Sequence, residues 1–279
     1  MTAAPACSLS LAFPCIMGIV NVTPDSFSDG GQFFDADAAL QQALSLVREG
    51  AAIVDVGGES TRPGSDWVSL DEELRRVLPL VEALAGRTGV PISVDTTKAE
   101  VARRALAAGA EMINDVTALR GDPAMADVVA QSGRPVCLMH MLGQPKTMQE
   151  HPHYDDVVSE VLAFLEERMA FAVSRGVQEE QILIDPGIGF GKTVEHNLAL
   201  LRHLGRFAEL GRPVLLGASR KRFLGAILGN EPERRAIGTV ATTVLGIQAG
   251  AHVFRVHDVR PNFEALRVAL AVREGAPVV

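Results

Sequence analysis

The chain has 279 residues, of which 47% are hydrophobic and 22% are charged, a composition typical of globular rather than disordered proteins. Its 26 Lys and Arg residues against 34 Asp and Glu residues give a formal net charge of −8, which argues against a globally basic nucleic-acid binder. The three cysteines, Cys7, Cys15 and Cys137, form no CxxC motif and favour a reducing compartment such as the cytoplasm over a disulfide framework. The N-terminal segment lacks a basic n-region, so we expect no cleaved secretory signal.

Short apolar runs alternate with amphipathic stretches along the chain. The runs are rich in β-branched residues and too short for helices, so they predict buried parallel strands. These strands are expected at Ile16–Val20, Ile53–Val56, Ile92–Val94, Met112–Ile113, Val136–Met139, Ile182–Ile184, Val214–Leu216 and Val253–Val256. The stretches between them predict helices at Ala36–Glu49, Leu70–Leu84, Ala99–Ala107, Pro123–Gln131, Tyr154–Ser174, Val194–Leu204, Glu233–Gln248 and Asn262–Arg273.

Eight strands that alternate with eight helices predict an α/β fold, a (β/α)8 TIM barrel forming a single domain over residues 1–279. An open doubly wound sheet is the alternative, although such sheets typically have fewer strands and a Gly-rich first turn. Residues 236–254 contain no Asp, Glu, Lys or Arg, but Gln248, His252 and several Thr and Gly residues make the segment only weakly hydrophobic. We therefore expect a helix of small residues followed by a buried strand, and no membrane span.

Polar or charged residues lie at the end of every predicted strand. In a (β/α)8 barrel the active site lies at this end, where the βα loops begin. Any one such residue can simply cap the following helix. Because all eight strands end this way, we expect the side chains to converge on one mouth. They are Asn21, Asp55, Glu59, Asp95, Asn114, Asp115, His140, Asp185, Ser219, Arg220, Lys221, Arg255, His257 and Asp258.

Two of the predicted βα connections are unusually long and polar. They cover about residues 22–35 and 57–69, and we expect both to be mobile active-site loops that close over a ligand. A plain solvent-exposed insertion would explain their Gly, Ser and Asp residues. It would not explain Phe27, Phe33, Phe34 and Trp67.

Eight segments between about Ile16 and Arg273 together resemble the dihydropteroate synthase family of folate biosynthesis, the target of sulfonamides. The segments are MGIVNVTPDSFSDGG (17–31), DVGGESTRPG (55–64), ISVDTTK (92–98), INDV (113–116), LMHM (138–141), LIDPGIGFGK (183–192), GASRKRF (217–223) and RVHDV (255–259). The resemblance implies a transferase that joins 6-hydroxymethyl-7,8-dihydropterin diphosphate to p-aminobenzoate, releasing 7,8-dihydropteroate and pyrophosphate. It also implies a (β/α)8 barrel, Mg²⁺ and a homodimer.

The resemblance also implies roles for individual residues. The pterin pocket would consist of Asp95, Asn114, Asp185 and Lys221. By its chemistry Arg255 can stack on the pterin, and Met139 could support the ring, although a Met within an apolar strand is more often core filler. The pocket agrees with the chemistry, because a pterin presents N–H donors that carboxylates accept well, and a guanidinium can stack on a flat ring.

For the diphosphate, the resemblance points to Asn21 as the Mg²⁺ ligand and to Arg255 and His257 as charge-neutralising groups. Thr61 and Arg62 would close over the site. The p-aminobenzoate slot would be bordered by Phe27, Pro63, Phe190 and Ser219. Asp95 and Asp29 would stabilise the cation left when diphosphate departs, and Asp29, Asp95, Lys221, Arg255 and His257 are the expected catalytic residues.

Two other functions remain as alternatives. A methyltransferase that uses methyltetrahydrofolate would share a pterin-binding barrel with the Asp/Asn/Asp pocket, but it would not need the diphosphate site or the two long loops. A non-catalytic pterin-binding paralogue would be expected to show damage in those loops or in the p-aminobenzoate slot. Neither alternative accounts for the complete set of segments.

Overall fold

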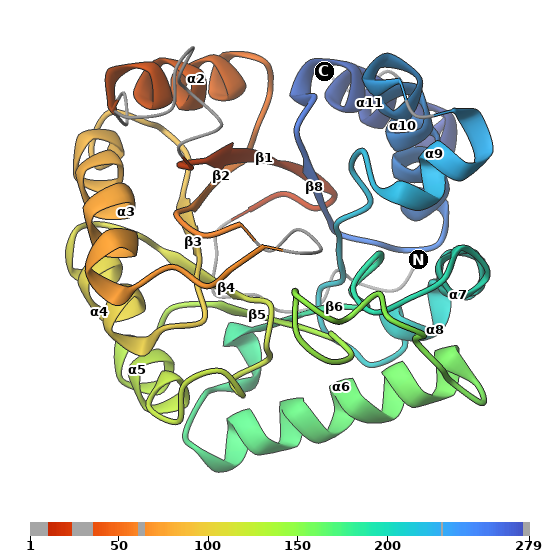
Figure 1. Ribbon diagram of the computed structural model, residues 1–279. Coiled ribbons are helices and arrows are strands. Elements are labelled where there is room, and N and C mark those ends of the chain that lie inside the picture. The colour runs from red at the N-terminus through yellow and green to blue at the C-terminus, as the bar shows by residue number, and fades with distance from the viewer. Residues whose placement is uncertain (1–10, 24–35, 61–64, 230, 276–279) are drawn as a thin grey trace.

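The structure, a computed structural model, describes residues 11–23, 36–60, 65–229 and 231–275. Within them, the predicted strands and helices are arranged as a barrel of parallel strands surrounded by helices (Figure 1). The strands are β1 (Cys15–Asn21), β2 (Ile53–Gly57), β3 (Ile92–Asp95), β4 (Met112–Asp115), β5 (Val136–Met139), β6 (Ile182–Asp185), β7 (Leu215–Leu216) and β8 (Val253–Val256). The helices are α2 (Ala36–Arg48), α3 (Leu70–Leu84), α4 (Ala99–Ala107), α5 (Met125–Ser132), α6 (Val157–Ser174), η1 (Glu179–Gln181, a 3₁₀-helix), α7 (Val194–Arg202), α8 (Gly205–Ala208), α9 (Arg222–Leu228), α10 (Pro232–Gln248) and α11 (Val259–Glu274).

The sheet runs in the order β6-β5-β4-β3-β2-β1-β8-β7 with parallel neighbours throughout. The two ends of this order, β6 and β7, are joined by a parallel bridge between Ile184 and Val214. In that bridge Ile184 N donates to Pro213 O at 3.0 Å. The bridge closes the sheet, so the prediction of a (β/α)8 barrel is confirmed and the open sheet is wrong.

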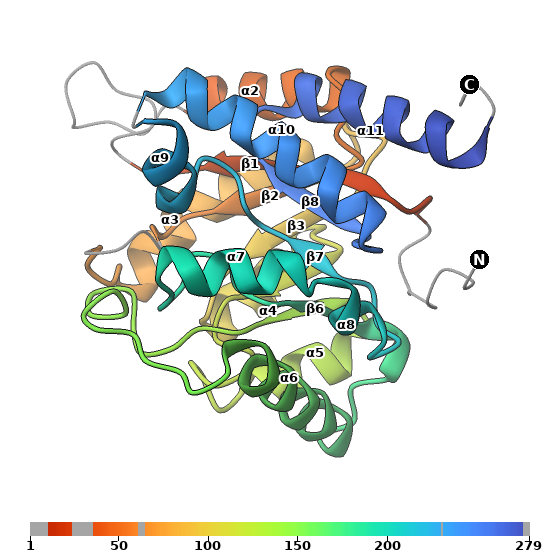
Figure 2. The ribbon, with the colours of Figure 1, turned by 90° about the vertical axis from the view of Figure 1, so that its right-hand side faces the viewer.

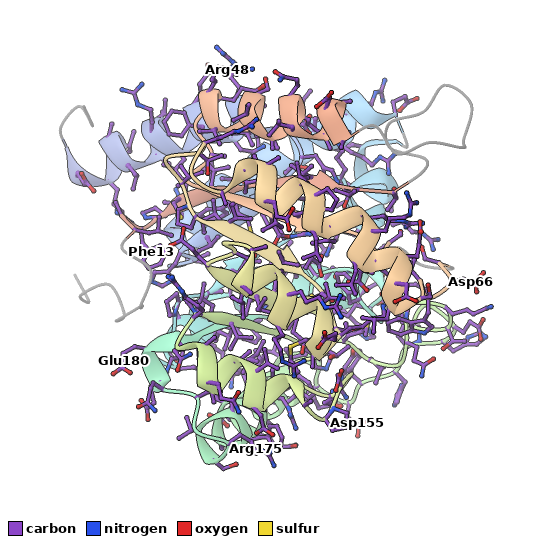
Figure 3. All side chains as sticks on the ribbon, turned by 90° about the vertical axis from the view of Figure 1, so that its left-hand side faces the viewer. Phe13, Arg48, Asp66, Asp155, Arg175 and Glu180 are labelled. Atoms are coloured by element: carbon purple, nitrogen blue, oxygen red, sulfur yellow. The ribbon has the colours of Figure 1, made fainter. Side chains whose placement is uncertain are left out.

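Side chains of alternate residues point into and out of the barrel, as the pleat of a strand requires. The outward residues form the main hydrophobic core between strands and helices. The inward residues of the lower barrel form a separate apolar cluster, with Leu11 and Phe13 packed against it. Its buried members are Cys15, Met17, Ile53, Met112, Cys137, Leu183, Leu215 and Val253. Figure 3 shows Phe13 at one end of the molecule and Asp66, in the connection after β2, at the other. Apolar side chains therefore fill the barrel interior toward the amino ends of the strands. The polar side chains lie at the carboxyl ends.

Local capping explains where several helices begin. Ser69 accepts a hydrogen bond from Glu72 N at the start of α3, and Thr193 forms a capping box with His196 at the start of α7. Asp156 caps α6 through Val158 N and Ser159 N. This cap places the start of α6 three residues after the predicted Tyr154.

The predicted helices differ from the structure mainly at their ends. α5 begins at Met125 rather than Pro123, α7 ends at Arg202 rather than Leu204, and α11 begins at Val259 rather than Asn262. The pattern also missed α8, α9 and η1, which are too short to show a clear amphipathic period. Residues 236–254 contain most of α10 and the first half of β8, as predicted, and none of the described helices is long and apolar enough to cross a membrane.

Candidate active site

A layer of polar side chains lies directly above the apolar cluster inside the barrel. On β2, Asp55 follows the inward Ile53 by two residues, and on β8 Arg255 follows the inward Val253 in the same way. The register then aligns Gly57 with Asp95, and Asp95 with Asn114. Alternation along each strand thus points residues from distant parts of the chain into the same barrel interior.

Arg255 is the centre of this layer. Its Nε donates to Asp55 Oδ2 at 2.6 Å, and its Nη2 donates to Asp95 Oδ2 at 2.8 Å. Asn114 Nδ2 also donates to Asp55 Oδ2, at 3.4 Å. Because Asp55 is fully buried, the arginine is held in a fixed orientation by two carboxylates at once.

Burial and charge shift the ionisation of this network. Burial raises the pKa of Asp95 to about 7, and Asp55 adds to the rise while Arg255 opposes it. Burial also disfavours the charge on Arg255, but Asp55 and Asp95 together hold its pKa above its ordinary value. The arginine is therefore a permanent cation beside a carboxylate that titrates near neutral pH.

Asp185 and Lys221 form a second corner of the site. Asp185 Oδ1 accepts a hydrogen bond from Gly187 N at 2.7 Å. Lys221 Nζ donates to Ile188 O and lies 4.2 Å from the centre of the Phe190 ring. The lysine, the carboxylate and the aromatic ring therefore lie around the loop that follows β6.

Desolvation affects both charged groups of this corner. Burial lowers the pKa of Lys221 to about 7, although Asp185 opposes the shift. Burial also raises the pKa of Asp185, with Lys221 as the largest opposing influence. Perturbed titratable groups of this kind are frequent at functional sites.

Ser219 and His257 pair with each other in the loops that follow β7 and β8. Ser219 Oγ and His257 Nδ1 are 2.9 Å apart, and His257 N donates to Ser219 Oγ at 3.1 Å. Met139 lies in a small buried apolar cluster with Val116, Met141 and Met148, and Phe190 packs against it. The predicted pterin support and one predicted border of the p-aminobenzoate slot are thus in contact with the same apolar cluster.

Asn21 lies at the carboxyl end of β1, on the same side of the barrel as Asp95. Asn21 Oδ1 and Asp95 Oδ2 are 3.8 and 4.0 Å from the position that a Cβ on Gly57 would occupy. The missing side chain of Gly57 leaves space beside Asn21 Oδ1, an amide oxygen of the kind that Mg²⁺ accepts as a ligand, whereas Asp95 Oδ2 already accepts a hydrogen bond from Arg255. The described residues contain no group of three or more His, Cys, Asp or Glu side chains that could hold a metal ion. A Mg²⁺ ion at Asn21 would therefore take most of its ligands from substrate and water.

The remaining predicted site residues lie outside the described part of the chain. They are Phe27 and Asp29 in the first long connection and Thr61, Arg62 and Pro63 in the second. Those of the first connection fall within residues 24–35, and those of the second within residues 61–64.

Not every polar residue at a strand end faces the mouth. Asp115 points away from the barrel interior and accepts hydrogen bonds from Thr117 N and Leu119 N. Arg220 and Asp258 pair with each other at the surface. His140 is buried with its Nδ1 2.9 Å from Lys192 Nζ. For Asp115, which is on β4 next to the inward Asn114, the expected convergence is wrong, because neighbouring residues on a strand point to opposite faces.

Asp55 belongs to the polar layer, as its place on the second predicted strand leads us to expect, but the resemblance gives it no chemical role. Its distance of two residues from the inward Gly57 is the signal for an inward direction. Among the described residues, Asp55 Oδ1 and Ser93 Oγ are buried without a hydrogen-bond partner, and these two residues are paired in register. An open groove of about 510 Å³ lies outside the layer, and none of the predicted site residues lines it. Its lining residues are Trp67, Thr97, Lys98, Thr117, Arg120, Gly121, Asp122, Met141, Gly143 and Gln144.

The sequence and fold of this chain are similar to those of known pterin-binding proteins. A family model described as pterin binding enzyme matches residues 17–257. A dihydropteroate synthase of Haemophilus influenzae is 49% identical over 260 residues, covering 93% of this chain and 94% of that protein. The solved Xanthomonas albilineans dihydropteroate synthase with 4-aminobenzoic acid is 54% identical, with a TM-score of 0.88 and 93% of each chain covered. The enzyme of the same organism in complex with 7,8-dihydropteroate is 51% identical, with a TM-score of 0.86 and 95% of each chain covered. The chain therefore belongs to the dihydropteroate synthase family of pterin binding enzymes.

Proposed function

We infer that this protein condenses 6-hydroxymethyl-7,8-dihydropterin diphosphate with p-aminobenzoate to give 7,8-dihydropteroate and pyrophosphate. The observation that supports this most directly is the buried layer in which Arg255 is held by Asp55 and Asp95, beside Asn114 and near the Asp185–Lys221 corner. This arrangement offers carboxylate acceptors, an amide and two cations inside a single barrel mouth. A pterin diphosphate needs that combination, because its ring edge donates hydrogen bonds and its tail is an anion.

The pterin would lie in the polar layer. Asp185 and Asn114 would pair with the ring edge, Lys221 would donate to a ring oxygen or nitrogen, and Met139 would support one face. Arg255 would stack on the pterin with its guanidinium plane. The two carboxylates that hold Arg255 fix this plane before the ligand binds, which lowers the entropic cost of binding.

The diphosphate would lie toward Asn21, Arg255 and His257. Asn21 would hold Mg²⁺ together with diphosphate oxygens and water, and the ion would supply neutralisation of negative charge on the leaving group. Arg255 and His257 would donate to the same oxygens. Ser219, which pairs with His257, would keep the imidazole oriented.

The reaction begins when the bond between the pterin methylene carbon and the diphosphate oxygen breaks, and the electron pair leaves with the diphosphate. The methylene cation that remains is conjugated with the pterin and is stabilised by the carboxylates of Asp95 and Asp29. The neutral amine of p-aminobenzoate then attacks the methylene carbon, a C–N bond forms, and the nitrogen loses one proton. No dedicated general base is needed, because the proton can pass to solvent.

The p-aminobenzoate slot would be bordered by Phe27, Pro63, Phe190 and Ser219. Thr61 and Arg62 in the second connection would close over the site and exclude water, which would otherwise trap the cation. Because sulfonamides inhibit the family that this chain resembles, they are expected to bind at this site. If the protein were a methyltransferase, the residues assigned to bind diphosphate would have no role. The relatives compared above are synthases.

The protein would act in the cytoplasm as a homodimer, without nucleic-acid or membrane partners. Exposed apolar residues on neighbouring helices support the dimer. Ile237 and Leu245 on α10 are 70% and 59% exposed, and Val268 and Val272 on α11 are 64% and 78% exposed. Figure 2 shows α10 and α11 side by side on the outside of the barrel, so a second copy could cover both helices at once.

An assay with pterin diphosphate, p-aminobenzoate and Mg²⁺ tests this function. We expect pyrophosphate release and formation of 7,8-dihydropteroate in equal amounts, and only slow pyrophosphate release without p-aminobenzoate. Pterin binding without turnover would instead indicate the non-catalytic paralogue. Turnover of methyltetrahydrofolate would indicate the methyltransferase.

A further inference from the structure

Lys98 makes a buried ionic cluster with two glutamates that no step of the proposed reaction uses. Its Nζ lies 2.6 Å from Glu59 Oε2 and 2.5 Å from Glu73 Oε2. The Glu73 side chain is fully buried, and those of Glu59 and Lys98 are 7% and 22% exposed. Two carboxylates this deeply buried need a cation between them, because an unpaired buried charge is very costly.

This cluster, defined as Glu59, Glu73 and Lys98, reaches both ends of the second long connection. Glu59 lies near its start, and Glu59 Oε1 accepts a hydrogen bond from Val68 N, near its end, at 2.7 Å. Ser65 Oγ donates to Ser60 Oγ at 2.9 Å, a second hydrogen bond between the start and the end of the connection. The described residues on the two sides of 61–64 are therefore tied to each other through one carboxylate and one hydroxyl pair.

The cluster also ties the connection to the wall of the barrel. Glu73 is on α3, and its Oε1 accepts a hydrogen bond from Thr96 Oγ1 at 2.6 Å. Thr96 directly follows Asp95 of the polar layer. Arg76, also on α3, donates from Nη1 to Gly58 O at 2.9 Å. A Cβ on Gly58 would lie 2.6 Å from Val77 Cγ2, so only glycine lets the backbone lie this close to α3.

A second ion pair on the same connection provides a contrast. Lys146 Nζ lies 2.7 Å from Asp66 Oδ1, but the two side chains are 65% and 81% exposed. Figure 3 shows Asp66 at the edge of the molecule. An exposed pair of this kind contributes little to stability or position. The connection therefore takes part in one buried ionic cluster, with Lys98, and in one exposed ion pair, with Lys146.

We propose that the cluster of Glu59, Glu73 and Lys98 is a positioning unit for the arylamine side of the site, because it fixes the described flanks of the second long connection, residues 59–60 and 65–68. The proposal rests on the proposed function. In that function Thr61 and Arg62 of this connection close over the site, and Pro63 borders the p-aminobenzoate slot. It adds residues that touch neither substrate. They act through the backbone of the connection at Glu59 and Val68.

The test compares Lys98→Met, Lys98→Arg and Glu59→Gln with Lys146→Met as the matched control. Lys98→Met and Lys146→Met remove the same charge and keep a similar side-chain volume, one from the buried cluster and one from the surface pair. Steady-state kinetics would give kcat and separate KM values for p-aminobenzoate and for the pterin diphosphate. Trp67, the only tryptophan of the chain, lies within this connection, and Lys98 Nζ is 5.9 Å from the centre of its ring. Acrylamide quenching of its fluorescence in Glu59→Gln, which keeps Lys98, therefore reports the position of the connection independently of activity.

We expect Lys98→Met and Glu59→Gln to raise KM for p-aminobenzoate by about tenfold or more, the loss of one charge-assisted hydrogen bond. KM for the pterin diphosphate should change by less than about threefold, because the polar layer stays intact. Trp67 should become more accessible to acrylamide in Glu59→Gln. Lys98→Arg should recover most of the p-aminobenzoate affinity, and Lys146→Met should resemble the wild type in every measurement.

Equal effects of Lys98→Met and Lys146→Met would overturn the proposal. So would a fall in activity that merely follows the amount of folded protein, with both KM values and Trp67 quenching unchanged. If Lys98→Met does not fold, Glu59→Gln decides the question, because Glu73 keeps its partner in that variant. A wild-type protein without turnover would contradict the proposed function instead, while Trp67 quenching would still show whether the cluster holds the connection.

Discussion

Asp185 shows how one residue combines a structural and a binding role. Its Oδ1 accepts the Gly187 N–H and so shapes the loop after β6, while Oδ2 lies 3.5 Å from the position that a Cβ on Gly217 would take. Lys221 Nζ is 4.0 Å from the same position. Gly217 therefore leaves room between the carboxylate and the ammonium group, where a ligand edge can approach both.

We expect Asp185→Asn to weaken pterin binding by about tenfold to a hundredfold, because a buried charge-assisted hydrogen bond is worth about 1.5–3 kcal/mol. The amide has one acceptor oxygen, and its NH₂ group would face either Gly187 N–H or the ligand donors. Isothermal titration calorimetry with a pterin measures the effect. Unchanged affinity in a folded variant would remove Asp185 from the pocket.

Arg255 and His257 are expected to act on different parts of the substrate. Arg255 is inside the polar layer between Asp55 and Asp95, whereas His257 is paired with Ser219 nearer the mouth. Arg255→Ala should weaken binding of both hydroxymethyl-dihydropterin and its diphosphate, and His257→Ala should weaken mainly the diphosphate. Comparing the two ligands with each variant gives the result. If Arg255→Ala leaves the phosphate-free pterin unaffected, the stacking role is wrong.

The two residues titrating near neutral pH should shape the pH profile of kcat/KM. Burial raises the pKa of Asp95 to about 7, so below this pH it becomes neutral and loses its stabilisation of the cation. Burial lowers the pKa of Lys221 to about 7, so above this pH it loses its positive charge. We therefore expect a narrow bell-shaped profile. In Lys221→Arg the alkaline limb should disappear and the acid limb should remain, whereas an identical profile in that variant would contradict the assignment.

Among the elements, the loop between β6 and α7 is held more tightly than its glycine content suggests. Its carbonyl oxygens at Ile188, Gly189 and Gly191 accept hydrogen bonds from Lys221, Gln149 and Tyr154 respectively. Gly187 has a φ of +69°, and a Cβ there would lie 1.8 Å from His140 O. The loop thus depends on close backbone contact with the end of β5.

Gly187→Ala should therefore destabilise the protein by about 1–3 kcal/mol, the usual cost of forcing extra atoms into a packed region. The added methyl group would also move the N–H that Asp185 accepts, so pterin affinity should fall in the protein that remains folded. Thermal unfolding and pterin titration measure the two effects. Gly211→Ala is a suitable control, because that glycine also has a positive φ, +73°, but a Cβ there would meet nothing within 4 Å. Equal losses of pterin affinity in both variants would show that close contact at Gly187 is unimportant.

Secondary structure was predictable where the local pattern is strong. β5, β8, α3 and α4 have the predicted ends, because their apolar periodicity is clear and their flanking residues break it. The predicted strand from Val214 is shorter in the structure, since β7 contains only Leu215 and Leu216 and Val214 forms the isolated bridge to β6. That bridge depends on residues 30 positions apart in the chain, and no local pattern shows it.

At the scale of the whole molecule, the most exposed large apolar side chains lie on one side of the barrel. Apolar side chains on α10 and α11 remain exposed on one side of the barrel, while α6 lies on the other side (Figure 1). Val173 on α6 is also exposed, at 42%. Leu245 on α10 and Val173 on α6 are therefore two exposed apolar positions, one on each side, at which the same substitution to Asp can be compared.

We expect the wild-type protein to be a dimer and Leu245→Asp to be a monomer, because a carboxylate buried at a dimer interface would lack a partner. Val173→Asp should leave the dimer intact. Light scattering after size-exclusion chromatography measures the mass of each variant. A monomeric wild-type protein would exclude the dimer. Dissociation by Val173→Asp but not by Leu245→Asp would place the interface away from α10 and α11.

The sequence alone determined the number and order of the strands, the barrel class, the family and most residues of the polar layer. These depend on local periodicity and on short segments whose residue types are read directly. Only the tertiary structure decided which strand-end residues face each other. Arg255 meets Asp55 across 200 positions of sequence, while Asp115, next to Asn114, points out of the barrel. The physical reason is that strand alternation and sheet closure set the direction of each side chain, and both depend on pairing between distant segments.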